Sequence, residues 1–357
     1  MSIQTALKTG ILLFLFASCG LMENDQPISH KEFLRTHKYS IGQTRLELLD
    51  SIRERPIKTE LWYPTADTTK VNIATEYPFQ LAPTAQDADL LPGKFPLVLL
   101  SHGTGGNRIS QMWLASELVG NGYLVAAVDH YGNTLDNKIP ENFVRIWERP
   151  LDIRFLLDHL LADEKWGPKI DTSQIAMAGF SLGGYTTIAL AGGQIDYQAL
   201  KAFSETAEGK MEFTLPELGD ISPLITPEII KDGNERFNKL KDGRITTFVA
   251  MAPALGQGFN RTAQFANIQS PLLLIGAQND RRTPVVNNAQ HYKKLIPSAT
   301  YIELEGKVGH YIFMNEAKGG LKRSAPIIFK DDPSVNRKEV HQKVARKVLR
   351  FFEENLK

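Results

Sequence analysis

One serine in the sequence lies in a pattern that favours nucleophilic chemistry. Residues 179–183 read Gly-Phe-Ser-Leu-Gly and fit G-x-S-x-G around Ser181. The apolar residues 175–180 predict a buried strand before the serine, and residues 186–191 predict a helix after it. On such a turn the hydroxyl projects from the edge of the sheet, and the glycines leave room for neighbouring chains. We predict that Ser181 is a nucleophile; the alternative is a structural turn with an incidental serine.

A serine hydroxyl is a weak nucleophile, so this chemistry also needs a base and an acid that orients the base. Asp280 follows a predicted strand at 272–276, and His310 follows a predicted strand at 301–304 in a glycine-containing loop. The chain order of serine, acid and histidine is the order found where a nucleophile stands on this kind of turn. We therefore predict His310 as the general base and Asp280 as its orienting acid.

Competing acids have ordinary interpretations. Asp280 taken alone could cap the next helix, as Asn279 beside it could. Asp129 precedes the nucleophile in the chain. Asp152 is interpreted as a first-turn carboxylate that the helix dipole favours. Of these three aspartates only Asp280 lies both after the nucleophile and at a strand end, so it remains the predicted acid.

The negative charge that develops in acyl transfer needs donors aimed at it in advance, usually backbone N–H groups. Residues 101–106 read Ser-His-Gly-Thr-Gly-Gly and follow a predicted strand at 97–100. We expect the N–H groups of Thr104 and Leu182 to form this oxyanion hole. His102 is expected to hold the loop by hydrogen bonds rather than to act as a base.

The sequence predicts no cofactor and no metal. The glycines near residue 103 fit neither G-x-G-x-x-G nor the lysine-containing phosphate loop, which argues against a dinucleotide or phosphate site. No H-E-x-x-H run or other tight group of metal ligands occurs. The 357 residues include 41 Lys and Arg against 40 Asp and Glu, and the net charge of +1 excludes nucleic acid as an expected partner.

Alternating strands and helices must position these groups. Residues 45–50 and 58–64 predict a leading antiparallel hairpin, and residues 65–94 predict a long surface connection. From there on, short apolar runs alternate with helical stretches, which predicts an α/β fold: a mostly parallel central sheet with helices on both faces. The expected strands are 95–100, 123–128, 175–180, 245–251, 272–276 and 301–304, and the expected helices are 109–118, 151–161, 186–191, 285–295 and 339–356.

Residues 196–244 interrupt this alternation with a run rich in Lys, Glu and Pro. Two interpretations stay open with equal weight: a cap over the site, or a solvated excursion packed to one side. We expect a single domain over residues 39–357 that contains this insert.

The N-terminus predicts export. Lys8 and the apolar run 10–17 are typical of a secretory signal, because the run is too short to cross a bilayer. Small residues then precede Cys19, the only cysteine, which favours a lipoprotein signal at 1–18 and lipidation of Cys19. The alternative is an ordinary signal peptide with an incidental cysteine. We expect a tether at 19–38 and a lipid anchor to a bacterial membrane, facing the periplasm or the exterior.

With these residues in hand, the chain resembles an α/β-hydrolase of the bacterial lipoprotein and secreted group called dienelactone hydrolase-like or platelet-activating-factor acetylhydrolase-like. The resemblance implies hydrolysis of carboxylic esters by acyl transfer, with Ser181 as nucleophile, His310 as base and Asp280 as acid. Dienelactone hydrolases carry a cysteine at the nucleophile position, and residues 251–254 hold no acid where the animal acetylhydrolases have theirs. The motifs that carry the resemblance are Leu-Trp-Tyr-Pro at 61–64, Ser-His-Gly-Thr-Gly-Gly at 101–106, Val-Asp-His at 128–130, Arg-Pro-Leu-Asp at 149–152, Phe-Ser-Leu-Gly-Gly-Tyr at 180–185, Asp-Arg-Arg-Thr-Pro at 280–284 and Gly-His at 309–310.

The expected partner is a small-molecule ester. Phe180, Tyr185, Tyr311 and Trp113 are the candidates for an apolar pocket wall, which favours uncharged acyl groups. No strongly hydrophobic lid is visible, so small or short-acyl esters are expected, with lactones and acetylated phospholipids as further candidates. A serine peptidase, an acyltransferase and a non-catalytic binding lipoprotein stay open as alternatives, and the sequence predicts no oligomeric state.

Overall fold

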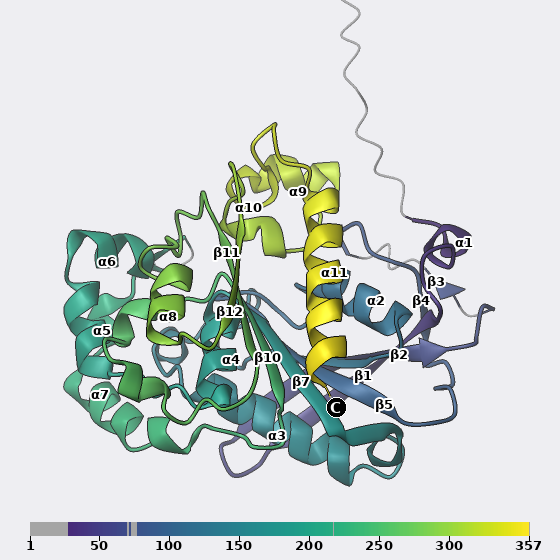
Figure 1. Cartoon of the computed structure of the whole chain (residues 1–357), viewed down its shortest axis with the longest axis horizontal. Helices are drawn as coiled ribbons and strands as arrows, with labels where there is room; N and C mark the ends of the chain where they lie inside the picture. Colours follow the sequence, from purple (N-terminus) through teal and green to yellow (C-terminus); the bar gives the residue numbers. More distant parts are fainter. Residues whose placement is uncertain (1–27, 70, 73–76, 217, 357) are drawn as a thin grey trace, which may run out of the picture.

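The computed structural model describes residues 28–69, 71–72, 77–216 and 218–356. One mixed sheet runs through the described residues, and Figure 1 shows its strands fanning across the middle of the molecule. The strand order is β12-β11-β10-β7-β5-β6-β2-β1-β4-β3. The predictions on residues 1–27, including the signal peptide and lipidation at Cys19, lie outside the described residues.

The strands from β12 to β6 are mutually parallel, as the alternation of strands and helices predicts. Side chains alternate along β5, so that Leu97 and Leu99 join one hydrophobic core while Val98 and Leu100 join the other. A strand with apolar residues on both faces is the kind that parallel sheets require, because helices cover both sides. The parallel strands are β5 (Phe95–Ser101), β6 (Leu124–Val128), β7 (Ile170–Phe180), β10 (Thr247–Met251), β11 (Leu272–Ala277) and β12 (Thr300–Leu304).

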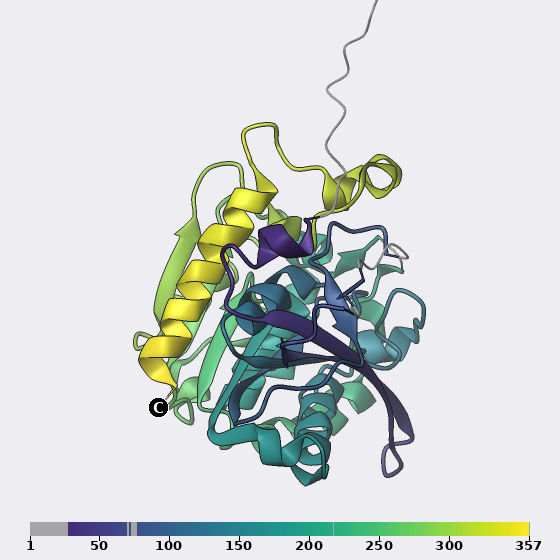
Figure 2. The same cartoon turned by 90° about the vertical axis from the view of Figure 1, so that its right-hand side faces the viewer.

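Helices cover the two faces of the sheet. On one face lie α2 (Met112–Gly120) and α11 (Arg337–Asn355), and Figures 1 and 2 show α11 running along the sheet. On the other face lie α3 (Glu148–Ala162), α4 (Leu182–Ala191) and α8 (Ala289–Leu295). In α11 the buried Val344, Val348 and Phe352 recur at helical spacing, which makes one side of the helix apolar.

The leading hairpin forms as predicted. Strand β1 (Ser40–Asp50) pairs antiparallel with β2 (Arg55–Thr65), and β2 pairs antiparallel with β6. The prediction of a purely surface connection over residues 65–94 was wrong for part of it. The short strands β3 (Val71–Asn72) and β4 (Thr84–Gln86) extend the sheet, because β4 satisfies the free backbone groups at the outer edge of β1.

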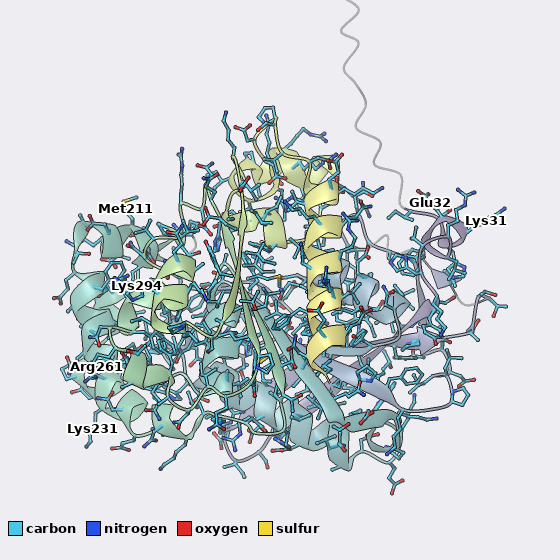
Figure 3. All side chains as sticks on the ribbon, viewed as in Figure 1. Lys31, Glu32, Met211, Lys231, Arg261 and Lys294 are labelled. Atoms are coloured by element: carbon cyan, nitrogen blue, oxygen red, sulfur yellow. The ribbon has the colours of Figure 1, made fainter. Side chains whose placement is uncertain are left out.

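The insert at 196–244 folds into a small helical unit. It comprises α5 (Tyr197–Ser204), α6 (Ala207–Phe213), the two-stranded β8 (Thr214–Leu215) and β9 (Gly219–Asp220), and α7 (Pro227–Asn234). Each helix begins after a side chain that accepts a backbone hydrogen bond: Asp196, Thr206 and Thr226. Figure 3 shows Met211 and Lys231 at the outer end of this unit, pointing away from the sheet.

Two further short helices, α9 (Gly319–Ser324) and α10 (Pro326–Phe329), lie between β12 and α11. Neither helix is predicted from the sequence, because runs of four to six residues are too short to show helical periodicity. Figure 1 shows them beside the upper end of α11. Phe329 of α10 packs against Phe79, with ring centroids 5.8 Å apart, so the two connecting segments meet.

The predicted tether over 19–38 was too long. Residues 30–33 form the short helix α1 (His30–Phe33), and Phe33 is buried with its ring stacked on His37. The backbone N–H of Lys38 donates to the carbonyl of Gly120 at 2.9 Å. The last part of the expected tether is therefore docked on α2, because it carries a buried aromatic residue and backbone partners. No helix in the described part of the chain is long and apolar enough to cross a membrane.

Candidate active site

Ser181 occupies a strained turn between β7 and α4. Its backbone has φ 57° and ψ −118°, a conformation that a non-glycine residue adopts only when its surroundings hold it there. Its N–H donates to the carbonyl of Met251 at 2.9 Å, and its own carbonyl accepts from the N–H of Ala254 at 3.0 Å. The residues after β10 therefore clamp the turn from the side.

The glycines around Ser181 are required by close backbone contacts. A Cβ atom at Gly179 would lie 2.0 Å from the carbonyl oxygen of Gly183, and one at Gly183 would lie 1.9 Å from that of Ser101. A Cβ atom at Gly184 would lie 2.7 Å from Cα of Pro253. Any larger residue would push β7, β5 or β10 away from the turn, so the G-x-S-x-G pattern reflects packing as well as chemistry.

The structure brings the three predicted groups together. Nε2 of His310 lies 3.0 Å from Oγ of Ser181, and Nδ1 of His310 lies 2.6 Å from Oδ2 of Asp280. All three side chains are buried, with exposed fractions of 7% for Ser181 and His310 and 6% for Asp280. A proton on Nδ1 donates to the carboxylate, which leaves the lone pair of Nε2 free to accept the serine proton.

The carboxylate of Asp280 is itself held in place. Its Oδ1 accepts backbone N–H bonds from Arg282 at 2.8 Å and Thr283 at 2.7 Å, and its Oδ2 accepts from Oγ1 of Thr283 at 2.9 Å. Thr283 is not among the site residues predicted from the sequence. The spacing of Thr283 three residues after an aspartate is the signal that could have found it, because it is typical of a local side-chain to backbone turn.

The two predicted oxyanion donors lie beside the nucleophile. Thr104 and Leu182 line the same cavity as Ser181. Leu182 is the first residue of α4, so its N–H has no acceptor within the helix. At Gly103, an added Cβ atom would lie 3.2 Å from Cβ of Ser181, which shows how closely the 101–106 loop approaches the turn. That the N–H groups of Thr104 and Leu182 stabilise an oxyanion remains a prediction.

His102 holds this loop from behind, as expected. Its Nδ1 lies 2.6 Å from the carbonyl of Gly103, and its Nε2 accepts from the N–H of His130 at 3.2 Å. Burial, with a further contribution from the charge of Arg149, lowers the pKa of His102 well below its ordinary value. A neutral ring with a donor at Nδ1 and an acceptor at Nε2 fits both contacts.

The competing acids are used elsewhere. Asp129 accepts from the backbone N–H and Nη1 of Arg108, both at 2.6 Å. Asp152 is buried and accepts from Nε of Arg55 at 2.9 Å and faces Nδ1 of His130 at 3.0 Å. Neither carboxylate contacts His310 in the described residues. The prediction of Asp152 as a first-turn carboxylate was wrong, because α3 begins at Glu148 and Asp152 instead binds these buried side chains.

A cavity of about 410 Å³ opens onto Ser181 and His310. The insert supplies part of its wall, which favours the cap interpretation over a solvated excursion to one side. A second part comes from α9, α10 and the segment at 77–79, which the sequence analysis did not connect with the site. The apolar lining includes Pro78, Phe79, Phe143, Ile146, Tyr197, Leu200, Phe213, Leu215, Ile221, Leu255, Met314, Leu321, Ile328 and Phe329.

Two of the four predicted pocket residues line this cavity, namely Phe180 and Tyr311. The other two predictions were wrong. Tyr185 is completely buried in the hydrophobic core, where its ring faces Phe259, and it does not line the cavity. Trp113 donates from Nε1 to the carbonyl of Phe313 at 2.7 Å and stacks on His341, which turns it away from the cavity.

The lining contains two charged side chains that the sequence analysis missed, Glu212 of α6 and Arg282 after β11. Glu212 accepts from the side-chain amides of Asn287 at 3.1 Å and Asn288 at 3.0 Å. Burial raises the pKa of Glu212 to about 7. Arg282 donates to the backbone carbonyl of Thr214 at 2.9 Å, so both residues join the insert to the loop that carries Asp280.

No group of His, Cys, Asp and Glu side chains in the described ranges could hold a metal ion. The groups that the site presents are a hydroxyl, an imidazole, a carboxylate and backbone N–H donors. Together with the parallel sheet and the strained turn after β7, they define the chain as an α/β-hydrolase in fold.

Comparison with known proteins agrees with this fold. The model of the family described as "Platelet-activating factor acetylhydrolase, isoform II" matches residues 60–135, a segment that contains the 101–106 loop and ends before Ser181. The ferulic acid esterase from Streptomyces cinnamoneus is similar in structure, with a TM-score of 0.60 and 19% sequence identity over 93% of this chain and 92% of that chain. No curated protein matches the sequence. The family match supports the resemblance to the platelet-activating-factor acetylhydrolase group and the expected enzyme class, a carboxylic ester hydrolase, and the structural match supports the fold. Neither match tests the expected lipoprotein form.

Proposed function

We propose that this protein is a serine esterase that cleaves carboxylic esters through an acyl-enzyme at Ser181. One observation carries the proposal: Ser181, His310 and Asp280 form a continuous hydrogen-bonded series, and Ser181 and His310 line an apolar cavity. A binding protein would have no use for a strained serine in contact with an oriented imidazole. The family and fold comparisons support the same enzyme class.

The first half of the reaction forms the acyl-enzyme. Oγ of Ser181 attacks the ester carbonyl while Nε2 of His310 takes its proton, and the carbonyl oxygen becomes an oxyanion. The N–H groups of Thr104 and Leu182 stabilise that charge. The imidazolium, stabilised by Asp280, then gives its proton to the departing alcohol oxygen, and the carbon–oxygen bond of the ester breaks.

The second half releases the acid. A water molecule gives a proton to Nε2 of His310 and attacks the acyl carbon, which regenerates the oxyanion in the same hole. The bond to Oγ of Ser181 then breaks, and the imidazolium returns the proton to the serine. One ester and one water thus give one alcohol and one carboxylic acid.

The cavity supports a wider substrate range than the sequence suggested. At about 410 Å³ it falls within the range of small-molecule sites, so it has room for more than an acetyl group. Its lining is apolar apart from Glu212 and Arg282 at one side and the polar groups around the triad. We propose esters in which an uncharged hydrocarbon or aromatic group fills this space, of medium size rather than acetyl esters alone.

The test is hydrolysis of nitrophenyl esters from acetate to octanoate by the purified chain. The proposal expects turnover that disappears in Ser181→Ala and survives in Ser110→Ala, which removes the other serine hydroxyl lining the cavity. Matched nitroanilides separate the esterase from a peptidase, and addition of short alcohols separates hydrolysis from acyl transfer. Turnover that persists in Ser181→Ala at the wild-type rate would overturn the assignment.

The location is a separate proposal. We propose that Cys19 carries the lipid anchor, which the apolar run at 10–17 and the small residues before Cys19 support. Labelling of cells with a fatty-acid probe should mark the wild-type chain and not Cys19→Ser. Equal labelling of both would contradict the anchor without affecting the esterase proposal.

A further inference from the structure

Arg149 is a buried cation that the proposed reaction does not use directly. It lies on α3 with an exposed fraction of 1%. No carboxylate in the described part of the chain forms an ion pair with it, and its Nη1 has no hydrogen-bond partner there. The charge of Asp152 favours the charged form of Arg149 but forms no salt bridge with it, so burying this guanidinium remains costly in free energy and calls for a compensating role.

The contacts of Arg149 reach both halves of the predicted oxyanion hole. Its Nη2 donates to the backbone carbonyl of His102 and lies 3.5 Å from Oγ of Ser101, at the start of the 101–106 loop. Its Nε lies 3.4 Å from Oγ1 of Thr186 in α4. One planar group therefore touches the loop that carries Thr104 and the helix that begins at Leu182.

The loop carbonyls need such a donor because of where they lie. A Cβ atom at Gly183 would come within 1.9 Å of the carbonyl oxygen of Ser101 and 2.8 Å of that of His102, so both carbonyls press on the first turn of α4. Without Arg149, the carbonyl of His102 would remain buried but would have lost its charged hydrogen-bond donor. Rotation of that carbonyl away from its buried position would then lower the free energy of the loop. The same rotation would move the N–H of Thr104.

We propose that Arg149 is a positioning residue that clamps the 101–106 loop to α4 and so fixes the distance between the two oxyanion donors. The inference rests on the proposed esterase function. Burial lowers the pKa of Arg149 to about 9, so the guanidinium keeps its charge at pH 7 and remains a strong donor. Arg149 contacts neither Ser181 nor His310. Its removal should therefore weaken stabilisation of the transition state more than it weakens substrate binding.

The experiment compares Arg149→Met with Arg53→Met. Arg53 is a matched control, because it donates to Asp50, Glu148 and Asp152 in the neighbouring buried ionic cluster but does not reach the loop. Both variants lose a cation and some thermal stability. The assay is kcat and KM on a nitrophenyl ester per active site titrated with a fluorophosphonate, together with inhibition by a trifluoromethyl ketone, whose tetrahedral adduct places an oxyanion in the hole.

The clamp predicts that Arg149→Met lowers kcat roughly 10- to 100-fold, somewhat less than removal of an oxyanion donor itself, while KM changes less than about threefold. The inhibition constant of the ketone should rise by a similar factor. Arg53→Met should keep its kcat per site. Arg149→Lys, which retains a charged donor to the loop but loses the Nε contact, should recover part of the activity.

Thr186→Val provides a second test of the clamp if Arg149→Met does not fold. It removes the acceptor of Nε and should lower kcat a few-fold at constant KM; the same kcat as wild type would overturn the clamp. The clamp also fails if Arg149→Met and Arg53→Met lose kcat per site equally. A wild-type chain that neither turns over esters nor labels with the fluorophosphonate overturns the proposed function and the clamp together, whereas an active wild type with an unaffected Arg149→Met overturns the clamp alone.

Discussion

Nδ1 of His310 lies 2.6 Å from Oδ2 of Asp280, while Nε2 of the same ring lies 3.0 Å from Oγ of Ser181. One imidazole is thus held on one side and directed at the nucleophile on the other. The carboxylate that holds it is fixed by the N–H and hydroxyl of Thr283. The orientation of the base is therefore built into the loop after β11 before any substrate arrives.

Replacing the acid tests this relationship. Asp280→Asn removes the negative charge that orients and stabilises the imidazolium, so kcat should fall about 10⁴-fold with the fold retained, as triads generally lose when their acid becomes an amide. Asp129→Asn is the control, because Asp129 contacts Arg108 instead of the histidine. Its kcat should stay within a few-fold of wild type. Similar losses in both variants would show that Asp280 has no special role.

The close packing around the nucleophile predicts a strong effect of a single methyl group. Gly183→Ala would place Cβ 1.9 Å from the carbonyl oxygen of Ser101, which forces the turn and β5 apart. We expect a loss of about 1–3 kcal/mol or more in the free energy of unfolding, and loss of ester turnover. Gly243→Ala meets no atom within 4 Å and should change stability by less than about 0.5 kcal/mol. Denaturant unfolding measures both.

The cavity wall formed by α10 predicts a change in substrate range. Ile328 lines the cavity, whereas its neighbour Ile327 is 83% exposed and does not. Ile328→Trp fills part of the cavity, so kcat/KM for nitrophenyl octanoate should fall about tenfold or more relative to acetate, as a clash in a pocket typically costs. Ile327→Trp should leave that ratio unchanged. An unchanged ratio in Ile328→Trp would remove α10 from the substrate site.

Glu212 predicts a specific pH dependence of stability. Burial raises its pKa from 4.5 to about 7, so between these values the folded chain holds a proton that the unfolded chain has released. Its contribution to the free energy of unfolding is therefore largest below about pH 4.5 and falls as pH rises to about 7. Asp280 adds to the rise in this pKa, and Arg282 opposes it.

The measurement is the pH slope of that free energy in Glu212→Gln and in Glu208→Gln, an exposed position on the same helix. Glu212→Gln should flatten the decline between pH 5 and pH 7, and Glu208→Gln should leave it as in the wild type. The slope is compared rather than the absolute stability, because Asn287 and Asn288 donate to different oxygens of Glu212, and in a glutamine one of these atoms is an NH2 group that cannot accept. Identical slopes in the wild type and Glu212→Gln would contradict a buried, protonated carboxyl.

The central elements could be predicted from local sequence because their signals are local. The apolar runs at β5, β7 and β11 indicate strands buried on both faces, and glycines on both sides of Ser181 are needed wherever backbones pass this closely. The same alternation places Asp280 and His310 after parallel strands, whose ends meet at one edge of the sheet. Their hydrogen bonds follow from that placement.

The cavity could not be predicted because its walls come from segments that are distant in sequence and short. Phe79, Leu215 and Ile328 meet there although they belong to a connection, an insert and a four-residue helix. Aromatic residues close to the nucleophile in sequence misled the pocket prediction, since Tyr185 on α4 points into the core. Side-chain direction on a helix depends on which face packs against the sheet, and only the tertiary arrangement decides that.

The most direct test of the central claim is to treat the purified chain with a fluorophosphonate and to locate the label by mass spectrometry. Phosphonylation requires a serine activated by its base, so we expect one modified residue, Ser181, with ester turnover lost in proportion to the label. His310→Ala should not label at a comparable rate. A folded chain that remains unlabelled, or that labels at Ser110 while Ser181 stays free, would contradict the account.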